Sequence, residues 1–286
     1  MGYTVLAKQQ LSENVYQMRI AAPLIASQRK PGQFILLSVD DNYGERIPLT
    51  IADADTAEGS ITIIFQKVGY TTGLLAGLEP GDSLAVLLGP LGRPTHIEKV
   101  GRVVCVGGGI GVAPMHPIAK AFKEAGSQLT CIVGARSKEL VILEDRLRSF
   151  ADEVIVCTDD GSYGRKALVT EPLKELCESA EKPDLVIAIG PPVMMKFCTK
   201  TVVPYGVPIV VSLNTIMVDG TGMCGGCRVT VGGQTKFVCV DGPEFDGAQV
   251  DWDSMLKRLG AYKAQERRMA DHACNLMAQG DRLAGK

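Results

Sequence analysis

Apolar and polar residues alternate along the first third of the chain, which is the pattern of half-buried β-strands. A single helical turn is expected near residues 72–78, and pairs such as Pro-Gly and Glu-Gly punctuate the strands. The alternating stretches are residues 3–11, 14–22, 33–40, 47–53, 60–68 and 82–89. Residues 1–98 therefore predict a small antiparallel six-stranded β-barrel.

The sequence pattern changes near residue 102, where apolar runs begin to alternate with helical patterns. The runs RVVCVGG, LTCIVGAR, EVIVCTDD and DLVIAIG precede helical patterns at 113–125, 143–150, 169–179 and 192–203, and a last run follows at 208–214. Repeated strand–helix units predict a parallel sheet that binds ligands at the carboxyl ends of its strands. We assign residues 99–214 to this α/β domain.

Residues 215–286 predict a third module. It contains a loop rich in glycine and cysteine, a short hairpin (CRVTV and TKFVCV) and, from about residue 250, a long polar helix. The apolar positions of this helix, Trp252 among them, predict packing mainly against the body of the protein. The expected fold class is thus α+β, with three domains in this order.

Composition narrows the classes of function. The 286 residues carry 30 Lys and Arg against 32 Asp and Glu, without the basic cluster that would neutralise a nucleic-acid backbone. No apolar run approaches the ~20 residues that span a bilayer, and the N-terminus has no signal-peptide core. We expect a cytoplasmic protein with no nucleic-acid or membrane partner.

Cysteine usage separates two groups of thiols. The count of nine is odd, which argues against a secreted disulfide framework. Most of the cysteines lie in apolar strand or helix patterns and are expected as small buried hydrophobic residues, namely Cys105, Cys131, Cys157, Cys177 and Cys198. Cys224, Cys227 and Cys239 lie among glycines instead, so they need a chemical explanation.

The strand-to-helix turn at 103–122, VVCVGGGIGVAPMHPIAKAF, is rich in glycine. Glycines let a backbone approach a pyrophosphate, and the following helix directs its N-terminus at that anion. An ordinary tight turn is the alternative, but the strand ends at 134–136, 158–164 and 189–195 carry suitable residues at the same sheet edge. The candidate dinucleotide-binding residues are Gly107, Gly108, Gly109, Ile110, Gly111, Ala113, Pro114, Gly134, Ala135, Arg136, Asp159, Asp160, Gly161, Gly190, Pro191 and Met194.

The same turn, GGGIGVAP, resembles that of the ferredoxin reductase superfamily, and ERIPLTIAD (45–53) resembles the flavin signature of that superfamily. The resemblance implies FAD in the barrel, where Arg46 would neutralise the diphosphate. A solvated strand charge is the alternative for Arg46. Thr71 and Thr72 match the start of a short helix that faces the pyrophosphate. The candidate flavin contacts are Arg46, Pro48, Leu49, Thr50, Ile64, Phe65, Gln66, Thr71 and Thr72.

The cysteine spacing of the third module is close to that of a plant-type [2Fe–2S] loop, C-x4-C-x2-C…C. This chain has D-x4-C-x2-C-x11-C, so Asp219 stands in the place of the first cysteine. We predict a [2Fe–2S] cluster held by Asp219, Cys224, Cys227 and Cys239. Two alternatives remain. Asp219-Gly220 is also an ordinary turn pair, which would leave Asp241, His272 or Cys274 as the fourth ligand, and a structural zinc ion would accept three thiolates.

Over about residues 3–268 the chain resembles the electron-transfer subunit of dihydroorotate dehydrogenase. It more closely resembles the small subunit of NADH-dependent ferredoxin:NADP⁺ oxidoreductase, also called the sulfide dehydrogenase small subunit. The motifs RIPLTIAD, GGGIGVAP and VDGTGMCGGCRV carry this resemblance. The aspartate in place of the first cysteine separates the chain from the dihydroorotate branch.

The resemblance implies hydride transfer between NAD(H) and FAD, followed by single-electron transfer to the [2Fe–2S] cluster. It also implies a large glutamate-synthase-like partner subunit with FAD and [4Fe–4S] clusters, which binds NADP(H) and splits electron pairs to deliver electrons to ferredoxin. This chain has no further cluster motif, so it requires that partner. No acid or base in this chain is assigned to catalysis.

The strand end Thr158-Asp159-Asp160 favours NAD, because a carboxylate accepts hydrogen bonds from a ribose hydroxyl and repels a 2′-phosphate. Arg136 and Lys138 argue the other way. Competing hypotheses are a freestanding NAD(P)H diaphorase, a dihydroorotate dehydrogenase electron-transfer subunit, and a non-enzymatic scaffold containing zinc.

Overall fold

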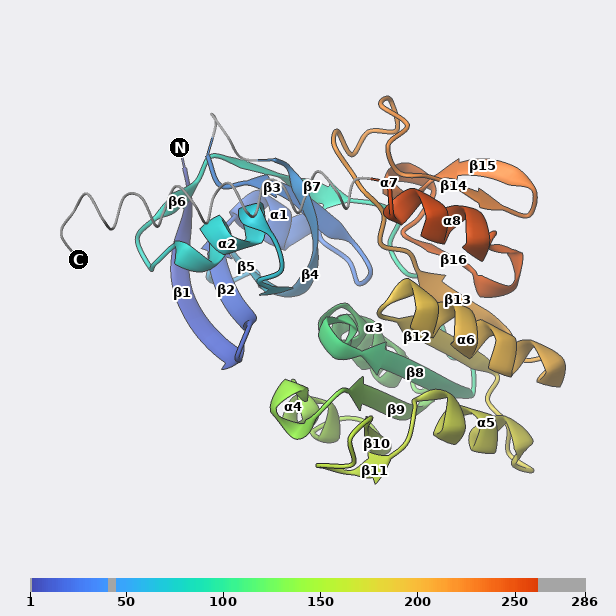
Figure 1. Cartoon of the computed structure of the whole chain (residues 1–286). Coiled ribbons are helices and arrows are strands. Elements are labelled where there is room, and N and C mark those ends of the chain that lie inside the picture. Colours follow the sequence, from blue (N-terminus) through green and yellow to red (C-terminus); the bar gives the residue numbers. More distant parts are fainter. Residues whose placement is uncertain (1, 41–44, 262–286) are drawn as a thin grey trace.

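The computed structural model describes residues 2–40 and 45–261. Seven strands and two short helices form the N-terminal unit, coloured blue to cyan in Figure 1. They are β1 (Tyr3–Ser12), β2 (Val15–Ala21), α1 (Pro23–Gln28), β3 (Phe34–Ser38), β4 (Ile47–Asp55), β5 (Ser60–Gln66), α2 (Tyr70–Gly77), β6 (Ser83–Leu84) and β7 (Val86–Leu91). The alternation of residues predicted this antiparallel unit because one face of each strand is buried against the others.

The barrel has one strand more than predicted. Its strand order is β6-β1-β2-β5-β4-β3-β7, and every neighbouring pair is antiparallel. The stretch 82–89, expected as one strand, divides into β6, which pairs with β1, and β7, which pairs with β3. These two short strands join opposite edges of the sheet and leave the barrel nearly closed.

The second unit is a sheet with helices on both faces. Its elements are β8 (Arg102–Gly108), α3 (Val112–Glu124), β9 (Gln128–Ala135), α4 (Glu144–Arg148), β10 (Glu153–Thr158), β11 (Arg165–Lys166), α5 (Thr170–Glu178), β12 (Leu185–Ile189), α6 (Pro192–Val202) and β13 (Ile209–Ser212). Strands β8 to β13 are parallel, in the order β11-β10-β9-β8-β12-β13. The predicted succession of strands and helices is confirmed.

The third unit contains β14 (Arg228–Val231), β15 (Gln234–Phe237), α7 (Val238–Asp241), β16 (Glu244–Asp246) and α8 (Trp252–Leu259). The predicted hairpin is present, but its second strand ends at Phe237, and the next four residues form a helical turn. The Asp241 carboxylate accepts the Phe237 N–H at 2.8 Å, which favours that turn over a longer strand. The part of the predicted long helix beyond residue 261 lies outside the described residues.

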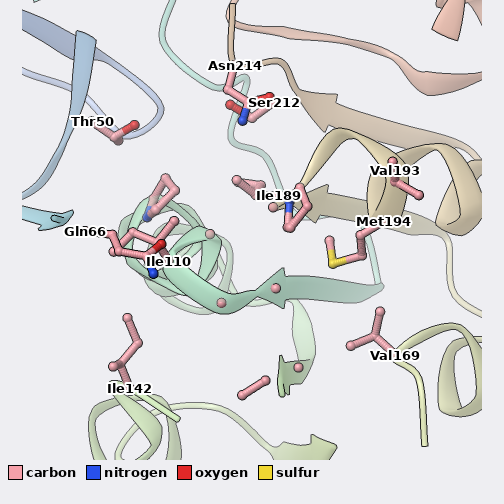
Figure 2. Close-up of a pocket in the computed structure, with 18 of the residues that line it drawn as sticks. Thr50, Gln66, Ile110, Ile142, Val169, Ile189, Val193, Met194, Ser212 and Asn214 are labelled. Atoms are coloured by element: carbon pink, nitrogen blue, oxygen red, sulfur yellow. The ribbon is translucent and has the colours of Figure 1, made fainter. Parts of the chain in front are cut away.

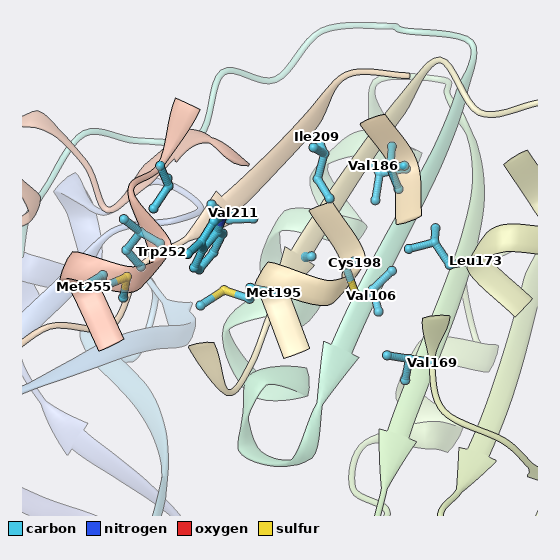
Figure 3. Close-up of a cluster of buried hydrophobic side chains, with 14 of the residues drawn as sticks. Val106, Val169, Leu173, Val186, Met195, Cys198, Ile209, Val211, Trp252 and Met255 are labelled. Carbon is cyan, nitrogen blue, oxygen red and sulfur yellow. The ribbon is translucent and has the colours of Figure 1, made fainter. Parts of the chain in front are cut away.

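This third unit lies beside both of the others in Figure 1. Strand β16 pairs antiparallel with β13 and so extends the parallel sheet. Figure 3 shows Trp252 and Met255 of α8 in one apolar cluster with Met195 of α6 and Val211 of β13. The predicted packing of Trp252 against the body of the protein is therefore confirmed.

Candidate functional site

A cavity of about 900 Å³ opens where the carboxyl ends of the parallel strands face the barrel. Barrel strands β4 and β5 form one wall, the turn after β8 forms another, and the segment after β13 forms a third (Figure 2). Its lining is mainly apolar, with few polar side chains, which is typical of a site for a flat aromatic cofactor. The predicted residues that line it are Pro48, Leu49, Thr50, Ile64, Gln66, Gly108, Gly109, Ile110, Gly111, Pro114, Gly134, Ala135, Arg136, Asp159, Gly190, Pro191 and Met194.

The glycine-rich turn has little space for side chains. A Cβ atom added at Gly111 would lie 2.6 Å from Gly190 Cα and closer still to the Ile189 carbonyl oxygen. Gly109 has a φ of 54°, which non-glycine residues rarely adopt. This turn brings the start of α3 to the cavity, with the helix N-terminus available to an anion.

Two adjacent carboxylates at the end of β10 have different surroundings. Asp159 lines the cavity together with Arg136. The Asp160 carboxylate instead accepts hydrogen bonds from the Ser162 backbone N–H at 2.9 Å and the Ser162 hydroxyl at 2.7 Å, and these hold its pKa below the usual range. Asp160 therefore stabilises the turn, and Asp159 is the carboxylate available to a ribose.

On the barrel wall, side chains of β5 alternate between the cavity and the barrel core, so only some of the candidate residues face the cavity. Ile64 and Gln66 of β5 line the cavity, whereas Phe65 points into the barrel core, where its ring stacks on Tyr16 with centroids 5.9 Å apart. The Thr72 hydroxyl accepts the Gly69 N–H at 2.9 Å at the start of α2. The predicted residues that do not line the cavity are Arg46, Phe65, Thr71, Thr72, Gly107, Ala113, Asp160 and Gly161.

The end of β13 and the segment directly after it were not predicted as part of the site from the sequence. Ser212, Asn214 and Thr215 line the cavity opposite the barrel wall, and the Thr215 hydroxyl oxygen is buried with no hydrogen-bond partner among the described residues. Figure 2 labels Ser212 and Asn214 above the nucleotide turn. The rule that ligands bind at the carboxyl ends of parallel strands applies to this strand too, and would have identified these residues.

The cysteine loop lies beyond this segment. Its backbone packs closely on the barrel, since a Cβ at Gly220 would lie 2.6 Å from a methyl carbon of Leu36. The Cys227 and Cys239 sulfurs are 3.2 Å apart, and the Gly226 N–H donates to Cys224 Sγ at 3.4 Å. Asp219 binds the loop itself, accepting the Thr221 N–H at 2.9 Å and the Cys224 N–H at 2.8 Å.

The structure thus brings the four predicted ligands together in two pairs, Cys227 with Cys239 and Asp219 with Cys224. Within residues 2–40 and 45–261, no three His, Cys, Asp or Glu side chains are grouped so as to hold a metal ion. The donor types nevertheless fit an iron–sulfur cluster, because thiolates are its usual ligands. Burial and the contact with Cys227 raise the pKa of the Cys239 thiol to about 12. His272 and Cys274, the weaker candidates, lie outside the described residues.

The barrel, the parallel sheet and the cavity between them define an oxidoreductase of the ferredoxin reductase class. The family model for an oxidoreductase NAD-binding domain matches residues 105–200, and that for the iron–sulfur cluster binding domain of dihydroorotate dehydrogenase B matches residues 214–251. These matches confirm the predicted nicotinamide and iron–sulfur modules. The chain belongs to the family of dihydroorotate dehydrogenase B electron transfer subunits and their homologues.

Three relatives illustrate the relationship. The chain is 48% identical to the dihydroorotate dehydrogenase B electron transfer subunit homolog of Thermotoga maritima, over 92% of each chain. It is 33% identical to the electron transfer subunit of Geobacillus thermodenitrificans, over 86% of this chain and 96% of the other. A solved structure of the NADH-dependent reduced ferredoxin-NADP oxidoreductase, studied for flavin-based electron bifurcation, aligns with a TM-score of 0.90 at 46% identity, over 96% of this chain and 98% of that one.

The remaining sequence-based expectations concern membrane-spanning segments and the isolated cysteines. Among the residues that the structure describes, no helix has the length and apolar character needed to cross a membrane. The cysteines described at 105, 131, 157, 177 and 198 are free thiols in the interior, as predicted.

Proposed function

We propose that this chain is the NAD(H)-dependent electron-transfer subunit of a two-subunit oxidoreductase. When bound, FAD and a [2Fe–2S] cluster supply the conversion between two-electron hydride chemistry and single-electron transfer. The observation that carries the proposal is one shared cavity, which joins the barrel wall, the nucleotide turn and the segment leading to the cysteine loop. A flavin and a nicotinamide in contact require such a shared space.

The chain's own residues bind and orient the cofactors. Thr50 and Gln66 provide polar groups on the barrel wall, and the start of α3 provides backbone N–H groups for the dinucleotide phosphates. Asp159 would accept hydrogen bonds from the adenosine ribose and favour NAD over NADP, while Arg136 beside it limits that preference. Asp219, Cys224, Cys227 and Cys239 are the proposed cluster ligands.

The proposed partner is a large glutamate-synthase-like subunit that carries FAD and [4Fe–4S] clusters, binds NADP(H) and transfers electrons to ferredoxin. The 46% identity to a bifurcating oxidoreductase supports this choice. So do the exposed apolar side chains Val218, Met223 and Val240, which flank the cysteines. Free thiols in a chain of this kind suit the reducing conditions of the cytoplasm, which is part of the same proposal.

A second candidate is the electron-transfer subunit of a dihydroorotate dehydrogenase, which the names of the curated relatives favour. Asp219 in place of a cysteine argues against it. Identification of the large chain that co-purifies with this one decides between the two.

The central test is anaerobic purification of the chain with its native partner. We expect about one FAD, two iron atoms and two acid-labile sulfides per chain in addition to the partner's cofactors, and flavin bleaching on addition of NADH. Zinc in place of iron would remove the electron-transfer proposal. Full turnover by an isolated monomer, with no second chain, would favour a freestanding diaphorase.

A further inference from the structure

Two arginines hold the backbone of the cysteine turn, which we define as residues 224–227. Arg228 Nη1 donates to the Gly225 carbonyl oxygen at 3.0 Å, and the Arg228 backbone N–H donates to the same oxygen at 3.3 Å. Arg258 Nη2, from helix α8, donates to the Gly226 carbonyl oxygen at 3.2 Å. Two successive carbonyl groups of the turn are therefore fixed from outside.

Because a peptide unit is planar, fixing its carbonyl group also fixes the direction of its N–H group. In a trans peptide the C=O of one residue and the N–H of the next point in opposite directions. The Gly225 carbonyl oxygen faces Arg228, and the N–H of the same peptide unit, on Gly226, donates to Cys224 Sγ at 3.4 Å. The Gly226 carbonyl oxygen faces Arg258, which by the same geometry directs the Cys227 N–H away from α8.

Helix α8 holds Arg258 rigidly. Trp252 and Met255 are buried in the core shared with α6, and Trp252 Nε1 donates to the Gly247 carbonyl oxygen at 3.1 Å. The Asp251 carboxylate caps the helix by accepting the Ser254 N–H at 3.0 Å. Arg258 is half-buried and lies 32 positions from the carbonyl that it binds, so its contact exists only in the folded protein.

We propose that Arg258, assisted by Arg228, is a positioning residue of the iron–sulfur site that raises the reduction potential of its cluster. Reduction adds one negative charge to the cluster. N–H groups aimed at the ligand sulfurs and a nearby guanidinium stabilise that charge more than they stabilise the oxidised state. This inference rests on the proposed [2Fe–2S] cluster.

The test compares three variants of the complete, cluster-loaded complex by redox titration followed with electron paramagnetic resonance. Arg258→Gln removes the charge and the contact, and we expect the equilibrium constant for cluster reduction to fall at least tenfold, which is about 59 mV for one electron. Arg258→Lys keeps the charge and should give a smaller fall. Lys257→Gln removes the same charge from an exposed neighbour on α8 and should stay within about twofold, because solvent screens it.

The Arg258→Gln spectrum should also show changed g-values, and the smaller fall in potential in Arg258→Lys separates a charge effect from a purely structural role for α8. A wild-type potential and spectrum in Arg258→Gln would overturn the proposal. If that variant does not assemble, Arg228→Gln decides instead, because it removes the contact with the Gly225 carbonyl oxygen and should lower the potential more than Lys257→Gln does. An unchanged potential again overturns the proposal. Failure of the proposed function is distinguishable, because the wild-type complex would then show no iron or acid-labile sulfide beyond that of the partner's clusters, and no [2Fe–2S] paramagnetic signal, before any variant is made.

Discussion

Asp159 and Asp160 are neighbouring carboxylates with different roles, one at the cavity and one in the turn. The sequence favoured NAD from the pair as a whole, because either carboxylate could meet a ribose. In the structure Asp159 lines the cavity, whereas Asp160 accepts two hydrogen bonds from Ser162. The preference for NAD over NADP is therefore expected to depend on Asp159 and not on Asp160.

We predict that Asp159→Asn raises the ratio of kcat/KM for NADPH to that for NADH about tenfold, since it removes a charge that repels the 2′-phosphate. Steady-state kinetics with both coenzymes measures the ratio. Asp160→Asn is the matched control, because it retains an acceptor oxygen for Ser162, and its ratio should stay within about twofold. An equal shift in both variants would contradict the assignment.

At the scale of elements, the turn between β8 and α3 brings a helix N-terminus to the cavity because this turn and the end of β12 approach each other closely. Gly111 is the tightest point, since the atoms facing it are backbone atoms of Ile189 and Gly190. Backbone atoms cannot rotate away as a flexible side chain can. A methyl group here must separate α3 from β12.

Gly111→Ala should therefore lower the free energy of unfolding by about 1–3 kcal/mol, as overpacking does in other cores, and weaken NADH binding. Thermal unfolding and a fluorescence titration with NADH measure these effects. Gly73→Ala in α2 is the control, because an added Cβ there meets no atom within 4 Å. Alanine favours helix by up to about 1 kcal/mol, so this variant should be as stable as the wild type or more so. A stable Gly111→Ala variant would show that the strand end can relax.

At the scale of the whole molecule, residues 92–95 connect the barrel to the third unit. The Arg93 N–H donates to the Gly242 carbonyl oxygen at 2.7 Å, and the Thr95 hydroxyl donates to Glu244 Oε1 at 2.6 Å. Burial raises the pKa of Glu244 from 4.5 to about 7 despite this hydrogen bond. A titrating group thus lies at the junction of the three units.

Because the folded protein holds the Glu244 proton more tightly than the unfolded chain does, the contribution of Glu244 to stability is complete below its unfolded pKa. It is lost as the pH rises through about 7. Glu244→Gln keeps the acceptor for Thr95 and should remove roughly 1–3 kcal/mol of the stability difference between about pH 5 and about pH 8. Chemical unfolding at both values measures it. An unchanged difference would mean that Glu244 is ionised in the folded protein.

The surface around the cysteine loop predicts where the partner binds. Met223 is 89% exposed next to Cys224, which leaves an apolar side chain for a partner to cover. Met223→Asp should weaken association with the co-expressed large subunit about tenfold, measured by biolayer interferometry. Leu24→Asp, at an 82% exposed site on α1, is the control and should bind normally. If the Met223→Asp variant binds with wild-type affinity and has unchanged iron and sulfide content, the partner does not bind at Met223.

The sequence by itself determined the succession of elements and the modules for nicotinamide and iron–sulfur binding. Hydrophobic periodicity and glycine or cysteine spacing are local properties, so a single strand, turn or loop expresses them. The motifs at 107–114 and 219–227 are of this kind. The chemistry of the cofactors could be inferred from them before any three-dimensional contact was known.

Only the tertiary structure decided which residues meet. It divided 82–89 between two edges of the barrel, placed Ser212 and Asn214 in the cavity, and turned Phe65 away from it. It also brought Arg258 to Gly226 across 32 positions. These outcomes depend on packing between segments distant in sequence, and no local pattern encodes such long-range contacts because many arrangements of the same elements satisfy it.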